Sequence, residues 1–213
     1  MSGRAEVTHQ AAGVDLTMMY AIHAALRRDA ARLLVDSTGA RVAAALIRNR
    51  WTLLTEQLHH HHTGEDGAIW PLLRPHLADD PTALAALDEL EAQHVAIDGA
   101  VAAVSEAIGA GRAELHERLH RFAELLQRHL ADEERDALPL IRCHITLAQW
   151  RAFENGQKRG LGLSGAARFF PWLLDDADPR RRTAVLATLP APLRLLVRYP
   201  WERSYRRALA LAS

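Results

Sequence analysis

Apolar residues recur at helical spacing over most of the chain. They repeat every three or four positions, which places them on one face of an α-helix. No stretch shows the period-two alternation of a half-buried β-strand. The pattern predicts four long helices followed by shorter ones after residue 145, and the long ones fall at residues 15–36, 41–73, 81–108 and 112–141.

Turn and cap residues separate these helices. Asp80 before Pro81 is typical of an N-cap followed by a proline in the first turn. Gly109 and Gly111 interrupt the chain before the fourth helix. Short connections force consecutive helices to run antiparallel. The sequence therefore predicts an all-α protein, an antiparallel up-down four-helix bundle over residues 15–142 that follows a flexible arm at residues 1–14.

Residues 146–213 have a different texture, with many Gly and Pro residues between short helical patches. We expect three or four short helices, packed against one side or end of the bundle as a helical extension. The aromatic patch around Phe169, Phe170 and Trp172 is the best candidate for the contact that anchors this extension.

Charge is distributed unevenly between these parts. Residues 1–139 hold 13 basic and 21 acidic residues, a net of −8, whereas residues 140–213 hold 13 basic and 5 acidic residues, a net of +8. One interpretation is that a basic extension packs on an acidic bundle. The other is that it binds an acidic partner. No reader motif for nucleic acid is recognisable, so nucleic acid is not the expected partner.

Two stretches follow one template, which indicates an internal duplication. The template is His, three residues, Glu, an acid, three residues, a large apolar residue and Pro. The first copy runs from His61 to Pro71, and the second, 68 positions later, runs from His129 to Pro139. A further histidine precedes each copy on the preceding helix, His23 in the first half and His94 in the second.

These residues predict a metal centre. A histidine and a glutamate four apart share one helix face, and two such faces in a bundle converge with the two other imidazoles. Imidazole and carboxylate without thiolate suit iron or manganese, and zinc less specifically. Two carboxylates for four imidazoles suggest that each bridges two metals, with room for an oxo or hydroxo bridge. The candidate ligands are His23, His61, Glu65, His94, His129 and Glu133.

Four more residues are candidates for an additional ligand or for a supporting partner of a ligand. Asp98 lies four after His94, and Tyr20 lies three before His23. His62 directly follows His61, and Asp136 lies seven after His129. The other histidines of the run at residues 59–62 are expected to be mostly solvated, because neighbouring residues fan around the helix axis.

The double motif resembles the hemerythrin-like (HHE cation-binding) family, most closely its actinobacterial type. The resemblance rests on the six candidate ligands and on the endings Trp70–Pro71 and Leu138–Pro139. It implies a four-helix bundle around a non-haem centre of two Fe ions per chain that meets dioxygen, peroxide or nitric oxide. Oxygen-carrying members have a second histidine on the third helix where this chain has Asp98, so reversible oxygen carriage is not expected.

Three functions remain open at this point. The first is a peroxide-consuming, catalase-like or otherwise oxidising redox protein. The second is a module that senses or binds oxygen, nitric oxide or iron and acts through its basic extension. The third is iron storage, although the Glu-x-x-His pairs of ferritin-like proteins are out of register between the two halves. The single cysteine, Cys143, and the polar N-terminus favour a cytoplasmic protein without a membrane partner.

Overall fold

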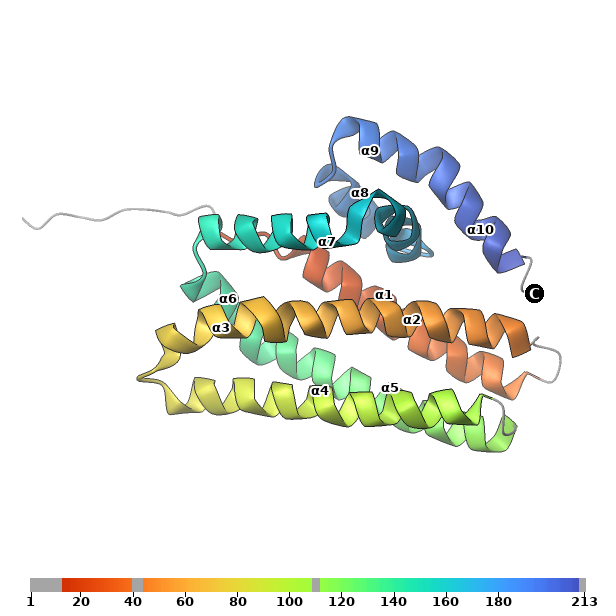
Figure 1. Cartoon of the computed structure of the whole chain (residues 1–213), viewed down its shortest axis with the longest axis horizontal. Helices are drawn as coiled ribbons and strands as arrows, with labels where there is room; N and C mark the ends of the chain where they lie inside the picture. The colour runs from red at the N-terminus through yellow and green to blue at the C-terminus, as the bar shows by residue number, and fades with distance from the viewer. Residues whose placement is uncertain (1–12, 40–43, 109–111, 211–213) are drawn as a thin grey trace, which may run out of the picture.

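Four long helices form the body of the computed structural model, which describes residues 13–39, 44–108 and 112–210. Successive helices run in opposite directions (Figure 1). Helix α1 packs against α2 and α5, and α4 packs against α5. The predicted all-α bundle is confirmed, and no strand occurs in the described ranges. The long helices are α1 (Thr17–Thr38), α2 (Ala44–Gly64), α4 (Pro81–Ala107) and α5 (Arg112–Asp132).

Some expectations fall outside these ranges. Most of the expected arm at residues 1–14, the first residues of the expected second helix and the break at Gly109 and Gly111 lie outside the described residues. Within them, Asp80 caps α4, because its carboxylate accepts a hydrogen bond from the Ala83 backbone N–H at 3.0 Å.

Both copies of the template continue into a π-helical turn that begins at the template glutamate. The backbone N–H of Trp70 reaches the carbonyl of Glu65, and that of Leu138 reaches Glu133, five residues back in each case. The following proline lacks an N–H, and its ring would clash with the carbonyl four residues earlier, so a widened turn relieves the conflict. These turns are η1 (Glu65–Ile69), which leads through α3 (Trp70–Leu73) to the 3₁₀ turn η2 (Arg74–Leu77), and η3 (Glu133–Ala137), which leads to α6 (Leu138–His144).

A layer of polar side chains lies between two apolar clusters of the bundle core. On α4, for example, Leu90 belongs to one cluster, Ile97 belongs to the other, and His94 lies between them. Leu126 and Ala137 flank the polar layer in the same way along the fourth helix. The bundle therefore holds its candidate ligands away from bulk water. Electrostatic interactions are stronger in this interior than in water.

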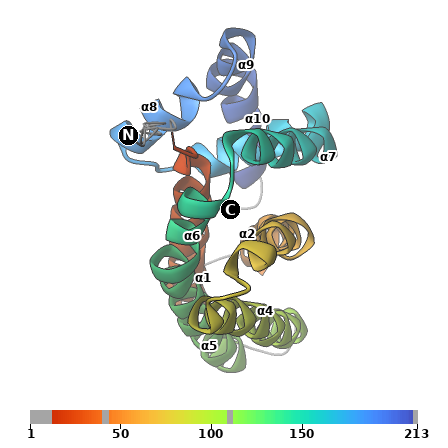
Figure 2. The ribbon, with the colours of Figure 1, turned by 90° about the vertical axis from the view of Figure 1, so that its left-hand side faces the viewer.

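The extension lies along one side of the bundle, next to α1 (Figures 1 and 2). Its first element consists of two helical segments that meet at a kink at Gly162, where φ is +61° and ψ is −175°, a non-helical conformation suited to glycine. Gly162 therefore interrupts the helix, and shorter helical segments make up the extension. The elements are α7 (Leu147–Leu174), α8 (Pro179–Ala187), α9 (Ala191–Leu196), the π turn η4 (Val197–Trp201) and α10 (Glu202–Ala210).

Trp172 anchors this extension to the bundle through both a hydrogen bond and apolar packing. It is fully buried, and its indole N–H donates to Oδ2 of the buried Asp29 on α1 at 2.7 Å. Phe170 and Trp172 belong to the same apolar cluster as the core residues of α1, and Phe169 packs against that cluster.

Ion pairs between extension and bundle mostly have the polarity opposite to the one expected from net charge. Arg32 of the bundle pairs with Asp175 at 2.6 Å and with Asp176 at 3.2 Å. Among the described residues, Arg168 with Glu56 is the one ion pair that joins a basic group of the extension to an acid of the bundle.

None of the described helices is both long enough and apolar enough to cross a membrane.

Candidate metal centre

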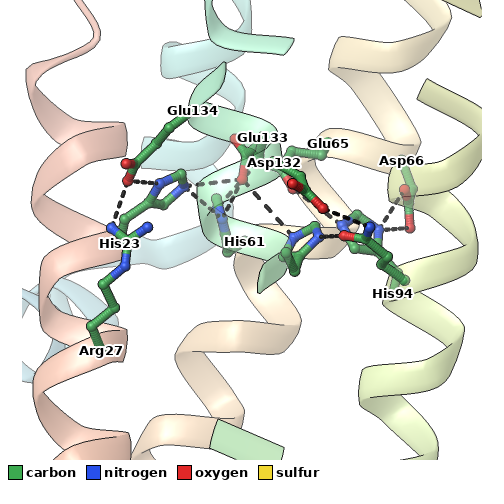
Figure 3. A network of polar contacts seen from close by, with 11 residues as sticks. His23, Arg27, His61, Glu65, Asp66, His94, Asp132, Glu133 and Glu134 are labelled. Carbon is green, nitrogen blue, oxygen red and sulfur yellow. Dashed lines mark hydrogen bonds and ion pairs between the residues drawn. The ribbon is translucent and has the colours of Figure 1, made fainter. Parts of the chain in front are cut away.

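The structure brings the six predicted ligands together in the polar layer of the bundle (Figure 3). All six side chains are buried, although imidazole and carboxylate groups are costly to remove from water. They come from α1 (His23), α2 (His61), η1 (Glu65), α4 (His94), α5 (His129) and η3 (Glu133).

The ligand atoms form two groups, within each of which they lie within 4.8 Å of one another. The first group contains His23, His61, Glu65 and Glu133. In it, the Nε2 atoms of His23 and His61 are 3.2 Å apart, and Glu133 Oε2 lies 3.1 Å from His23 Nε2. The second group contains only imidazoles, those of His62, His94 and His129.

The two carboxylates of the first group also lie close to imidazoles of the second group. Glu65 directs Oε1 toward His61 Nδ1 at 3.4 Å and Oε2 toward His94 Nε2 at 3.5 Å. Glu133 Oε2 lies 3.5 Å from His61 Nε2 and 3.9 Å from His129 Nε2. Each carboxylate thus lies close to imidazoles of both groups.

The unpaired atoms of the site show that it fits a cation. Both oxygens of Glu65 and of Glu133 are buried and have no hydrogen-bond partner among the described residues, and the same holds for Nε2 of His62, His94 and His129. A buried polar group left unpaired costs about 1–3 kcal/mol, so this concentration of lone pairs needs an ion to satisfy it. The donors are nitrogen and oxygen without thiolate, which suits iron or manganese.

Electrostatics inside the layer lead to the same conclusion. Burial and the neighbouring Glu133 raise the pKa of Glu65 well above its usual value. Burial opposes ionisation of Glu133 as well, but His23 and His61 outweigh it and hold the pKa of Glu133 well below its usual value. Burial lowers the pKa of His129 to about 3. A cation between the carboxylates would stabilise both in the ionised form, next to neutral imidazoles.

Outer partners hold three of the imidazoles in place, and the sequence analysis did not assign them. His23 Nδ1 donates to Glu134 Oε1 at 2.9 Å, and His94 Nδ1 donates to Asp66 Oδ1 at 2.9 Å. Glu134 and Asp66 are the acids that follow the glutamate in each template copy, so the repeated acid was the available signal. His129 Nδ1 lies 3.2 Å from Gln93 Oε1, and no sequence pattern marked that glutamine.

Of the four additional candidates, only His62 joins a group of possible ligands. Asp98 is exposed on α4, because Ile97 and Ala100 occupy the inward face beyond His94. Tyr20 is 41 % exposed on α1, and Asp136 pairs with Arg135 at 2.6 Å.

The histidine run at residues 59–62 is divided between solvent and the core. His59 and His60 are exposed as expected, but His62 is buried next to His61. Helix α2 therefore turns two consecutive histidines into the core.

These observations define a helical bundle with a candidate cation site in its core. The chain belongs to the family described as hemerythrin HHE cation binding domain, whose model matches residues 14–141. No curated protein and no solved structure matches the chain. Family and site together identify a metal-binding protein, for which iron is the typical cation of the family.

Proposed function

We propose that the chain is a non-haem di-iron protein that disproportionates hydrogen peroxide in a catalase-like reaction. The observation that carries the proposal is the position of Glu65 and Glu133 between two groups of imidazoles. One iron would be held by His23 and His61, the other by His94 and His129, and both carboxylates would be shared. When bound, such a pair supplies a two-electron redox couple, which matches the overall conversion of two H₂O₂ to O₂ and two H₂O.

The carboxylates behind the imidazoles favour redox chemistry over reversible oxygen carriage. Glu134 and Asp66 accept the Nδ1 protons of His23 and His94, and a carboxylate acceptor makes an imidazole a stronger donor to a metal. Stronger donors stabilise the ferric state, which disfavours the reduced form needed to carry oxygen. The argument against oxygen carriage therefore rests on Glu134 and Asp66. It does not rest on a carboxylate contact from Asp98, because Asp98 is exposed.

The test is peroxide addition to the iron-loaded full-length protein under an oxygen electrode. We expect repeated oxygen evolution, half a mole for each mole of peroxide added. Glu133→Ala, prepared in the same way, should lose iron and turnover together, and His60→Ala, at an exposed position, should retain both. A single spectral change without turnover would reject the catalase-like reaction.

A second candidate function, sensing through the extension, has one specific observation in its favour. Asp29, which binds Trp172, lies on α1 six residues after His23, so a single helix joins the site to the extension. Limited proteolysis of the ferric, reduced and nitric-oxide-treated protein tests this idea. State-dependent cleavage within residues 147–210 would favour sensing, and identical digestion patterns would reject it.

A further inference from the structure

We propose that His62 is a metal ligand, so that one metal position has three imidazoles, from His62, His94 and His129, and the other has two, from His23 and His61. The inference rests on the dinuclear centre proposed above. It concerns how this chain divides its histidines between the two positions.

The surroundings of His62 are those of a donor without a partner. Its side chain is 5 % exposed, and its Nε2 is buried with no hydrogen-bond partner in the described structure. Buried polar groups are nearly always paired, so an unpaired imidazole nitrogen needs an explanation.

Its ring is also placed among other candidate ligands. It stacks on His94 with ring centroids 3.9 Å apart and planes 14° from parallel. It meets His129 edge-on, with centroids 5.1 Å apart. All three imidazoles offer a nitrogen within 4.8 Å of the others, and an ion among them would satisfy His62 Nε2.

The orientation of α2 explains how it can supply two ligands in succession. Consecutive residues of a helix point about 100° apart. His61 faces His23 on α1, and His62 faces His94 and His129 on the opposite hairpin. The two histidines thus reach different metal positions from one turn of helix. Helix α4 contributes one imidazole only, because His94 is the single histidine of this helix.

The internal repeat shows that His62 is a departure from the symmetrical plan. The template copies are 68 positions apart, so the counterpart of His62 in the second half is Leu130, which is fully buried. The position is therefore interior in both halves, and an apolar side chain satisfies it in one of them. Placing an imidazole there in the first half adds a donor to one position and makes the two positions unequal.

The experiment compares His62→Leu, the substitution that the repeat itself supplies, with His60→Leu, the same change at an exposed neighbour. Metal-free full-length proteins are titrated with Co²⁺, followed by visible absorption and calorimetry, with circular dichroism to verify folding. Loss of a partner that merely supports a ligand weakens metal binding about 10–100-fold. We therefore expect His62→Leu to lose one ion or to weaken one binding step more than about 100-fold, beyond the range for a supporting partner, and His60→Leu to match the wild type.

Thermal unfolding separates a ligand from a packing residue. Leucine removes an unpaired buried nitrogen, so metal-free His62→Leu should melt at the same temperature as the wild type or higher, while its gain on adding Co²⁺ should be smaller. A lower melting temperature without metal, together with unchanged Co²⁺ affinity, would overturn the inference. If His62→Leu does not fold, the variant His62→Phe takes its place in both assays, because phenylalanine preserves a ring that can stack on His94.

The result also distinguishes this inference from the dinuclear centre. If the wild type binds a single Co²⁺, the dinuclear centre is wrong. The role of His62 is then decided by whether His62→Leu weakens that one ion. Weaker binding supports the ligand, and equal binding rejects it.

Discussion

The two halves of the bundle share a ligand pattern but differ in what surrounds it. His23, His61 and Glu65 in the first half correspond to His94, His129 and Glu133 in the second. Behind the ligands the correspondence is incomplete. The residue of the second half that corresponds to His62 is Leu130. One half therefore provides an extra imidazole where the other provides apolar packing.

The carboxylates behind the histidines show a second difference. Glu134 accepts from His23 and is also held by Arg27 Nη1 at 2.6 Å. The counterpart of Arg27, 71 positions later, is the exposed Asp98, and the ion pair described for Asp66 is with His94 alone. A neutralised carboxylate therefore supports His23, and an unneutralised one supports His94.

Contact with the extension is a third difference between the halves. On α1, Asp29 binds the indole of Trp172, whereas its counterpart on α4, Ala100, has no polar group in its side chain. A duplicated ligand set therefore need not produce two equivalent groups of candidate ligands. The outer contacts decide the electrostatic surroundings of each position.

The largest effect is expected from removing either shared carboxylate. Glu65→Ala and Glu133→Ala should each lose both ions, because each carboxylate contacts imidazoles of both groups. Elemental analysis after iron loading measures this, with His60→Ala as the control that should keep full iron. Full iron content in either glutamate variant would contradict the bridging placement and leave the halves independent.

Trp172→Ala tests the contact that only the first half makes. Truncation of a fully buried aromatic side chain costs about 3–5 kcal/mol, and here it also leaves the buried Asp29 carboxylate without its indole donor. Denaturant unfolding should show this loss. Tyr199→Ala, at a position that is 68 % exposed, is the matched control and should change stability by less than about 0.5 kcal/mol. Equal midpoints for both variants would show that the extension is not anchored at Trp172.

Glu134→Gln and Asp66→Asn compare the two outer carboxylates directly. Each variant keeps an oxygen acceptor for the histidine but loses the charge, so metal affinity should fall by about 10–100-fold. The fall should be larger for Glu134→Gln, because its side chain is 28 % exposed and held by Arg27, whereas Asp66 is 45 % exposed. Metal titration of both proteins measures the difference, and unaffected affinity in both would show that these carboxylates do not tune the site.

The smallest effect is expected at Asp98. From the sequence alone, Asp98 is a candidate ligand or supporting partner four residues after His94. Because Asp98 is exposed and outside both ligand groups, we now expect the potential and the metal content of Asp98→His to equal those of the wild type. A shift in potential, measured by redox titration of the iron-loaded proteins, would mean that this side chain does reach the site.

The sequence by itself determined the four helices, the duplication and the six main candidate ligands. These features depend on local geometry, because residues three and four apart share a helix face whatever the helix packs against. The template prolines likewise indicated where the second and fourth helices end. They did not reveal the π-helical turns, since the widening depends on how the backbone relaxes around the proline ring.

Only the tertiary structure decided which neighbours of those ligands face the site. His62 and Asp98 are each close in sequence to a ligand, yet one is buried among imidazoles and the other is in solvent. The outcome depends on how far each helix is rotated about its axis and on how wide an arc its neighbours cover, and both are set by packing between helices. On α2, the side of the helix that neighbouring helices cover includes two consecutive histidines. On α4, the covered side does not include Asp98.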